Sequence, residues 1–150
     1  MNLTGIEFSK KGYALKKTAH LSTMECFIVS VKDPSYALTI RGKGNPIVIS
    51  KWNKSDSQKF KIKKKTIKSK DNKLIFDVCG GDKQGNKVIQ FDDNDSSNQK
   101  FVFCADGTIR SPSGLCFDIE GGKMSDGTPI CMWSCHGGDN QQWRIVTQGI

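Results

Sequence analysis

Short apolar runs of four to six residues alternate with polar and glycine-rich stretches along the whole sequence. The alternation is clearest in residues 75–78 and 116–119, and a period close to two is typical of a β-strand with one buried face. Glycines clustered with Asp or Asn, as in residues 79–82, supply the turns between such strands. No window keeps the i, i+3, i+4, i+7 spacing of an amphipathic helix without a glycine or a β-branched run interrupting it. The pattern therefore predicts an all-β chain.

The tripeptide Gln-x-aromatic occurs three times, with steps of 41 and 42 residues between its glutamines. The glutamines are Gln58, Gln99 and Gln141, and the aromatic residues two positions later are Phe60, Phe101 and Trp143. A period of this length indicates one supersecondary unit that is used three times. We expect four short strands in each repeat, at about residues 23–64, 65–106 and 107–150, with pseudo-threefold symmetry.

The repeated tripeptide is interpreted mainly as a feature of the fold. A single four-stranded unit has no second layer to pack against, so the three units must bury their inner faces together. The aromatic residue of each tripeptide is expected to fill that common core. The glutamine is expected to hydrogen-bond the backbone of a neighbouring loop, because turns leave polar groups that need partners.

Residues 1–22 lie outside the repeat, and the domain proper is expected to span residues 23–150. Ile6-Glu7-Phe8 and Tyr13-Ala14-Leu15 flank a glycine turn, which predicts a small hairpin. An isolated hairpin is marginal in water, so we expect it to pack on the rest of the domain or on a second copy in a homodimer. The first residues lack a basic segment followed by an apolar one, so no secretory signal is visible, and the localisation stays unknown.

The net charge of +8 is concentrated in the first half of the chain. Residues 59–73 carry eight lysines, and Lys59, Lys61 and Lys63 alternate with Phe60 and Ile62 as in a strand with one wet face. The simpler interpretation is a solubilising surface, and the alternative is a site for an anionic partner such as a sulfated glycan, acidic lipid or nucleic acid. Base-specific nucleic-acid binding is not expected, because the cluster contains no arginine and exposes no aromatic side chain.

Metal, cofactor and catalytic signals are weak in this sequence. The six cysteines allow 15 full pairings, and a zinc site built from Cys116, Cys131, Cys135 and His136 would lack the second ligand pair of a finger. The acidic run at residues 92–95 lacks the spacing and the glycine of an ordinary calcium loop. The chain has two histidines and no recurring Ser/His/Asp set. We therefore expect no metal, no cofactor and no enzymatic activity.

Repeated Gln-x-Trp at about forty residues, preceded by Cys-x-Asp-Ile and an aromatic-x-Cys step, resembles the ricin B-type β-trefoil lectins and the related family 13 carbohydrate-binding modules. The resemblance covers about residues 25–148 and is strongest in the third repeat. It implies a β-trefoil of three four-stranded repeats and a noncatalytic lectin for terminal galactose or N-acetylgalactosamine, although some members of the family take xylan. Such a ligand favours an extracellular or cell-surface location.

The resemblance also implies the residues of two sugar sites. In the third repeat these are Asp118, Trp133 and Asn140, with Gln141 in support and His136 at the rim. In the second repeat they are Asp77, Phe91, Asn98 and Gln99, with Asn94 at the rim, and the smaller Phe91 predicts a weaker site. The first repeat has Thr39, Ser50 and Ser57 at these positions and is expected to have no such site, although the displaced Trp52 leaves a different one open.

The resemblance further implies a disulfide between Cys116 and Cys135, while the other four cysteines do not match the family pattern. Each sugar site is expected to be weak, with avidity arising from several sites. The competing function is a trefoil interaction module that binds sulfated polysaccharide or another acidic partner through the basic strand from Lys59 to Lys73. Salt distinguishes the two, since binding through lysines is screened and stacking on Trp133 is not.

Overall fold

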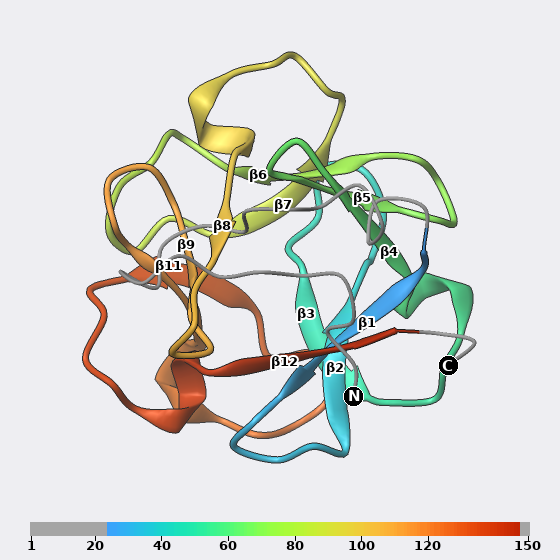
Figure 1. Cartoon of the computed structure of the whole chain (residues 1–150), viewed down its shortest axis with the longest axis vertical. Helices are drawn as coiled ribbons and strands as arrows, with labels where there is room; N and C mark the ends of the chain where they lie inside the picture. Colours follow the sequence, from blue (N-terminus) through green and yellow to red (C-terminus); the bar gives the residue numbers. More distant parts are fainter. Residues whose placement is uncertain (1–23, 148–150) are drawn as a thin grey trace.

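The computed structural model describes residues 24–147, and it forms a β-trefoil of twelve short strands. The strands are β1 (Cys26–Ser30), β2 (Tyr36–Thr39), β3 (Val48–Lys51), β4 (Phe60–Lys63), β5 (Thr66–Ser69), β6 (Ile75–Val78), β7 (Val88–Phe91), β8 (Val102–Phe103), β9 (Ile109–Arg110), β10 (Cys116–Ile119), β11 (Ile130–Trp133) and β12 (Trp143–Thr147). Figure 1 shows the three four-stranded repeats as three lobes around a common centre. The all-β prediction is confirmed, whereas the hairpin expected in residues 1–22 lies outside the described residues.

Helical structure between residues 24 and 147 consists of four three-residue 3-10 turns. They are η1 (Asp56–Gln58), η2 (Ser97–Gln99), η3 (Glu120–Gly122) and η4 (Asp139–Gln141). Three of them, η1, η2 and η4, end on the glutamine of the repeated tripeptide. No helix in this part of the chain has the length and apolar character needed to cross a bilayer.

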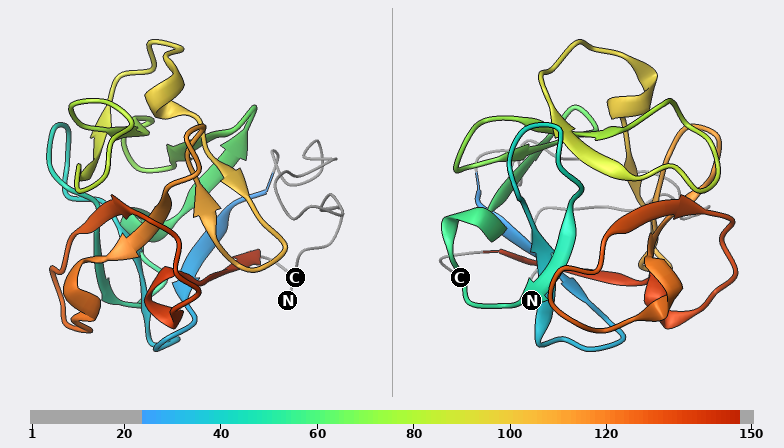
Figure 2. Two further views of the ribbon diagram at one scale, coloured as in Figure 1. Left: turned by 90° about the vertical axis from the view of Figure 1, so that its left-hand side faces the viewer. Right: turned by 180° about the vertical axis from the view of Figure 1, so that it is seen from behind.

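Six strands form the wall of a barrel, and three hairpins close one end of it. β12 pairs with β1, β1 with β4, β4 with β5 and β8 with β9, all antiparallel. The ring is completed by two backbone hydrogen bonds, from Phe101 N to Lys65 O (2.8 Å) and from Trp143 N to Gly107 O (2.8 Å). The hairpins are β2–β3, β6–β7 and β10–β11, one from each repeat (Figure 2).

The repeated aromatic residues are buried in the common core, as predicted, and two of them contact a hairpin phenylalanine of the next repeat. Phe60 and Phe101 are fully enclosed, and each lies edge-on to a hairpin phenylalanine, at 5.1 Å from Phe76 and 5.0 Å from Phe117. Phe76 and Phe117 stack on each other at 6.1 Å. The buried Trp143 donates its indole N–H to Phe117 O at 3.4 Å. The aromatic residues of the tripeptide thus share one core with the rings that strands β6 and β10 supply.

Each repeated glutamine is fully buried and holds the loop that precedes it. Its amide oxygen accepts from a loop N–H and its amide nitrogen donates to a loop carbonyl, as the sequence predicts. For Gln58, Gln99 and Gln141 in turn, the N–H donors are Asn53 N (2.9 Å), Asn94 N (3.0 Å) and His136 N (2.9 Å). The carbonyl acceptors, in the same order, are Lys51 O (2.9 Å), Asp92 O (2.8 Å) and Ser134 O (2.9 Å). The loop and the hairpin strand next to it are therefore fixed together in all three repeats.

Candidate functional site

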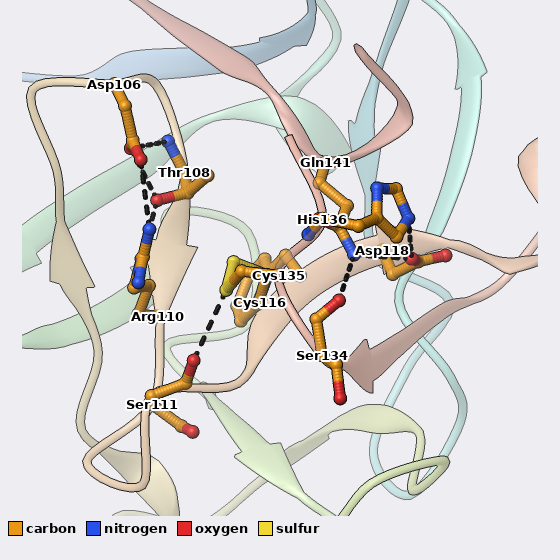
Figure 3. The surroundings of a disulfide bond; sticks show 12 residues. Asp106, Thr108, Arg110, Ser111, Cys116, Asp118, Ser134, Cys135, His136 and Gln141 are labelled. Atoms are coloured by element: carbon orange, nitrogen blue, oxygen red, sulfur yellow. Dashed lines mark hydrogen bonds and ion pairs between the residues drawn. A yellow bond between two sulfur atoms is a disulfide. The ribbon is translucent and has the colours of Figure 1, made fainter. Parts of the chain in front are cut away.

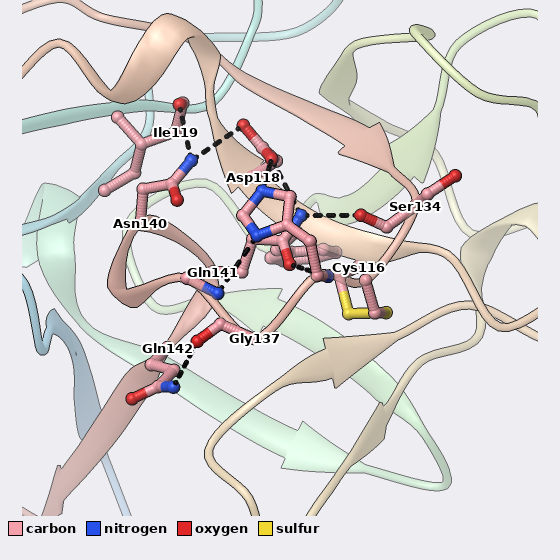
Figure 4. Close-up of polar contacts among 12 residues, drawn as sticks. Cys116, Asp118, Ile119, Ser134, Gly137, Asn140, Gln141 and Gln142 are labelled. Atoms are coloured by element: carbon pink, nitrogen blue, oxygen red, sulfur yellow. Dashed lines mark hydrogen bonds and ion pairs between the residues drawn. A yellow bond between two sulfur atoms is a disulfide. The ribbon is translucent and has the colours of Figure 1, made fainter.

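Asp118 lies in β10 at the centre of a polar cluster in the third repeat (Figure 4). Asn140 Nδ2 donates to Asp118 Oδ1 at 3.2 Å, and Gln141 Nε2 donates to Asp118 Oδ2 at 2.8 Å. A carboxylate oxygen has two lone pairs, so each oxygen of Asp118 keeps acceptor capacity for one further donor. The structure thus places three of the predicted site residues in direct contact.

Asp118 has a side chain that is largely buried and opens onto a hollow of about 440 Å³. Burial raises the pKa of this carboxyl above its usual value, and the hydrogen bonds from Gln141 and Asn140, together with the nearby charge of His136, oppose that rise. The hollow is also lined by Trp133, His136 and Asn140, together with Glu120 and Cys131. A polar ligand entering it would meet an acceptor that is fixed in position before binding.

Trp133 ends β11 and exposes 42% of its surface at the edge of this hollow. The structure therefore excludes Trp133 from the hydrophobic core and makes its ring available as an apolar platform. Its neighbour across the repeat boundary is Gly85, whose N–H donates to Met132 O at 2.7 Å. Gly85 has a φ of +89°, and a Cβ there would lie 3.9 Å from the Trp133 ring. The preceding repeat thus forms one wall beside the platform.

His136 lies above the carboxylate and depends on a glycine for its position. Its Nε2 is 3.7 Å from Asp118 Oδ2, and its Nδ1 accepts from Gly138 N at 3.0 Å. A Cβ on Gly138 would lie 2.6 Å from the imidazole and 2.9 Å from the Asn140 side-chain oxygen. Only glycine therefore allows His136 and Asn140 to approach the same backbone position.

The disulfide between Cys116 and Cys135, with 5.3 Å between the Cα atoms, confirms the pairing implied by the family resemblance (Figure 3). It ties the strand that carries Asp118 to the loop that carries His136. Cys26, Cys79 and Cys131 are free thiols. Burial raises the pKa of Cys131 to about 11, so this thiol faces the hollow as a neutral group at ordinary pH.

The second repeat reproduces the carboxylate and platform of the third. Asn98 Nδ2 donates to Asp77 Oδ1 at 3.1 Å, and Gln99 Nε2 donates to Asp77 Oδ2 at 2.8 Å. Phe91 ends β7 and is 39% exposed, in the position that Trp133 has in the third repeat. The predicted residues are therefore brought together in this repeat too.

The rim of the second site is more crowded than that of the third. The Lys43 Nζ atom lies 5.3 Å from the centre of the Phe91 ring and 2.6 Å from Asp92 Oδ2. The Ser96 hydroxyl lies 2.5 Å from the side-chain oxygens of both Asn94 and Asn98. A ligand approaching Phe91 must therefore displace a cation, and it meets amide oxygens that are already engaged.

The first repeat has the same scaffold without the carboxylate. Thr39 occupies the place of the aspartate, its Oγ1 lies 2.6 Å from Ser50 Oγ, and Gln58 Nε2 donates to it at 3.1 Å. The strand register places Ser50 where the other repeats have Phe91 and Trp133. The first repeat therefore offers neither an anionic acceptor nor an aromatic platform at these positions.

Trp52, the displaced tryptophan of the first repeat, is partly buried. Its ring lies 5.4 Å from the Phe27 ring in an edge-on contact, within a small cluster that includes Val29 and Ala37. Its indole N–H is buried and has no hydrogen-bond partner in the described part of the chain. Trp52 therefore packs as a satellite of the core.

Sequence reasoning missed the residues that the preceding repeat contributes to each site. Lys43, Gln84 and Asp126 contact the residues that follow the platform positions, which are Asp92, Ser134 and Lys51. Each is followed by a glycine whose N–H donates to the adjacent strand, and these glycines are Gly44, Gly85 and Gly127. Their steps of 41 and 42 residues equal those of the repeated glutamines, so the signal was present in the sequence.

Comparison with protein families gives a match over the second half of this chain. The model described as the ricin-type beta-trefoil lectin domain matches residues 66–150, which is more than half of the chain. Among curated proteins, ribosome-inactivating protein PMRIPt from Polygonatum multiflorum is 42% identical over 41 residues, which are 27% of this chain and 7% of that protein. The matched segment thus spans only a small part of that relative.

Solved structures share the fold over most of this chain. The designed threefold-symmetric protein ThreeFoil has a TM-score of 0.74 and 25% identity, over 81% of this chain and 97% of that one. The C-half of the earthworm R-type lectin, solved in complex with GalNAc, has a TM-score of 0.70 and 23% identity, over 83% of this chain and 99% of that one. These likenesses agree with the three lobes and their closing hairpins.

Proposed function

The chain belongs to the ricin-type β-trefoil lectin family, and on that premise we propose that it is a carbohydrate-binding lectin for terminal galactose or N-acetylgalactosamine. One observation carries this proposal. The Asp118 carboxylate is held by Asn140 and Gln141 beside a hollow that has the exposed Trp133 at its edge.

The chemistry of this arrangement suits a sugar ring with one polar edge and one apolar face. Asp118 accepts hydrogen bonds from two hydroxyls, and Asn140 offers its free side-chain oxygen as a further acceptor. Trp133 packs against the C–H face of the ring, which galactose presents because its axial 4-hydroxyl leaves that face apolar. An equatorial 4-hydroxyl would point away from the carboxylate.

The proposal assigns two sites of unequal strength to the chain. The site in the third repeat is the stronger, because Trp133 has a larger face than Phe91. In addition, the residue that the preceding repeat contributes beside the platform is the neutral Gln84 rather than a lysine. The second is the weaker, because Phe91 is smaller and lies under the Lys43 cation. A stacked ring and a few hydrogen bonds leave about −4 kcal/mol after the cost of immobilising the sugar, which corresponds to a millimolar site. Useful avidity therefore requires several sites to act together.

We also propose that the domain binds without catalysis. Both oxygens of Asp118 accept from amide N–H groups, which favours the ionised acceptor over a proton donor. Glu120, the other carboxylate that lines the hollow, is exposed and ion-paired with Lys87 at 3.3 Å. Incubation with aryl galactosides should release no product, and product release that is lost with Asp118→Ala would contradict this part of the proposal.

The central test is substitution of the carboxylate. Asp118→Ala should remove most binding to immobilised galactosides, and Asp77→Ala should weaken it less, because the second site is the weaker. Thr39→Ala is the matched control, since it changes the equivalent position of the first repeat and should leave binding unchanged. Binding would be measured on a glycan array and by calorimetry with the free sugar. If Asp77→Ala and Asp118→Ala together leave binding intact, the proposed sites are wrong.

A further inference from the structure

The hairpin formed by β4 and β5 carries a group of lysines that lack acidic partners. Within residues 24–147, none of Lys61, Lys63, Lys64, Lys65 and Lys68 forms an ion pair, and all five are exposed. Two flanking lysines do form ion pairs, Lys59 with Asp56 at 3.2 Å and Lys70 with Glu25 at 3.0 Å. We refer to the five exposed residues as the basic hairpin.

Two of these lysines face each other directly. Lys61 and Lys68 are cross-strand partners in the β4–β5 register, on the solvent side of the barrel wall. Like charges at directly opposite positions destabilise a strand pair. The fold therefore gains nothing from placing both lysines here, whereas a bound anion would turn their repulsion into attraction.

The turn of the hairpin is also unfavourable for lysine. Lys64 and Lys65 have φ values of +50° and +68°, so both central residues are in the left-handed region. Two-residue hairpin turns of this kind favour Asn-Gly, and each non-glycine residue in that region costs about 1–3 kcal/mol in strain. Backbone strain of this kind is concentrated at functional sites.

A hollow of about 610 Å³ lies beside this turn, and both cationic and apolar residues line it. Its lining includes Lys64, Lys65, Lys100 and Arg110, with Val102 and Pro112 between them. Lys100 and Arg110 are already paired with Asp95 and Asp106, at 2.7 Å and 2.9 Å. Within residues 24–147, Lys64 and Lys65 form no such ion pair, although Lys64 is close enough to Asp95 to help lower the pKa of that carboxyl.

We propose that the basic hairpin and the hollow beside its turn bind a sulfated polysaccharide. The spread of charge along two strands fits a chain of anionic groups, and the apolar residues that line the hollow fit the C–H face of a sugar ring. The β4–β5 hairpin lies on the opposite side of the molecule from β11 in Figure 1, whereas the hollow extends from the hairpin turn to the loop after β9.

Other anionic partners fit this surface less well. The large apolar side chains exposed between residues 24 and 147 are Val31, Phe91 and Trp133, and none lies on the hairpin. Stacking on unpaired bases and insertion into a lipid surface both use exposed apolar or aromatic groups, so neither nucleic acid nor a membrane is favoured. A sulfated chain requires only charge and a place for the ring.

The test uses a substitution that should improve the fold while it removes the site. Lys64→Asn with Lys65→Gly places the preferred residues in the turn, so the melting temperature should rise. Affinity for heparin should fall about thirtyfold, since two lysines are removed and each lysine near an anionic surface contributes about 1 kcal/mol. The affinity of the unchanged protein for heparin should also be largely lost when the salt concentration reaches a few hundred millimolar.

The matched control is Lys32→Gln with Lys54→Asn, which removes the same charge from other loops and also relieves a left-handed lysine at position 54. It should leave heparin binding within about twofold, because neither residue lies on the hairpin or lines the hollow. Equal losses in both double variants would overturn the proposal by showing that only net charge matters. So would tighter binding to duplex DNA, or to phosphatidylserine vesicles, than to heparin at the same salt concentration. Galactoside binding should be unchanged in the variant that combines Lys64→Asn with Lys65→Gly.

Discussion

The first and third repeats have the same backbone plan and differ in what that plan presents to solvent. Gln58 and Gln141 occupy equivalent buried positions, and each holds its loop through the same pair of backbone contacts. The side chain beneath Gln141 is Asp118, whereas the one beneath Gln58 is Thr39. The comparison teaches that the glutamine maintains the fold in every repeat, while the residue it contacts decides whether a ligand acceptor exists.

The second repeat is intermediate between the other two. It keeps the carboxylate and an aromatic platform, yet Lys43 from the preceding repeat lies over that platform. The loop that reaches the third repeat presents the uncharged Gln84 at the equivalent position. A site in this fold is therefore the product of two adjacent repeats.

The largest expected effect comes from the disulfide, which distinguishes the third repeat from the first. The cross-strand register gives the first repeat Ala37 at the position of Cys116. Cys116→Ser with Cys135→Ser should lower the free energy of unfolding by about 3 kcal/mol, because the unfolded chain gains the freedom of the opened loop. Urea unfolding with and without dithiothreitol would measure it. An unchanged midpoint in the reduced protein would contradict the expectation.

Substituting the repeated glutamines would separate their two contributions. Gln58→Leu and Gln141→Leu should each destabilise the protein by about 1–3 kcal/mol, because both leave loop N–H and C=O groups without partners. Of these two variants, only Gln141→Leu should also weaken galactoside binding, since Gln141 contacts a carboxylate whereas Gln58 contacts Thr39. Thermal unfolding and calorimetry would be compared for the two variants. If both variants lose the same amount of galactoside binding, the claim that Gln141 supports a ligand site and Gln58 does not is wrong.

Exchanging the platforms would sharpen the contrast between the second and third repeats. Trp133→Phe should weaken galactoside binding about three- to tenfold, and Phe91→Trp should strengthen the second site by less, because Lys43 still lies beside it. Combining Phe91→Trp with Lys43→Gln, which copies Gln84, should recover the difference. Affinities would be measured by calorimetry in the background of Asp118→Ala or Asp77→Ala. If Lys43→Gln leaves the galactoside affinity of the second site unchanged, the role assigned to the Lys43 cation is wrong.

The smallest expected effect is a difference in pH response. Burial raises the pKa of Asp118, so binding should weaken on acidification before pH falls to the usual carboxyl value of about 3.9. Stability should respond in the opposite direction, because a carboxyl with a raised pKa stabilises the fold when protonated and loses that contribution as pH rises through its folded pKa. Asp118→Asn removes both dependences and serves as the control. Calorimetry and thermal melts between pH 3 and 7 would show whether the two curves diverge.

Contacts between the proposed site residues could be predicted from the sequence wherever a residue and its spacing recur. Asp77 and Asp118 lie in equivalent strands, and each contacts the asparagine and the glutamine expected of it. The prediction missed Lys43 and Gln84, because residues about 50 positions apart come together only when adjacent repeats pack. It correctly placed the aromatic residues of the tripeptide in the common core, but it did not identify Phe76 and Phe117, which stack on each other there.

The sequence by itself determined the class of the fold, its threefold repetition and the asymmetry among the repeats. These follow from local period and from residue identity, which need no knowledge of contacts between distant segments. Only the tertiary structure decided which face of each hairpin is exposed to solvent and which loop borders each platform. It alone also showed that Gly138 leaves the space that the His136 imidazole occupies. Those features depend on how three units close around one core, because packing brings together side chains that the linear order keeps apart.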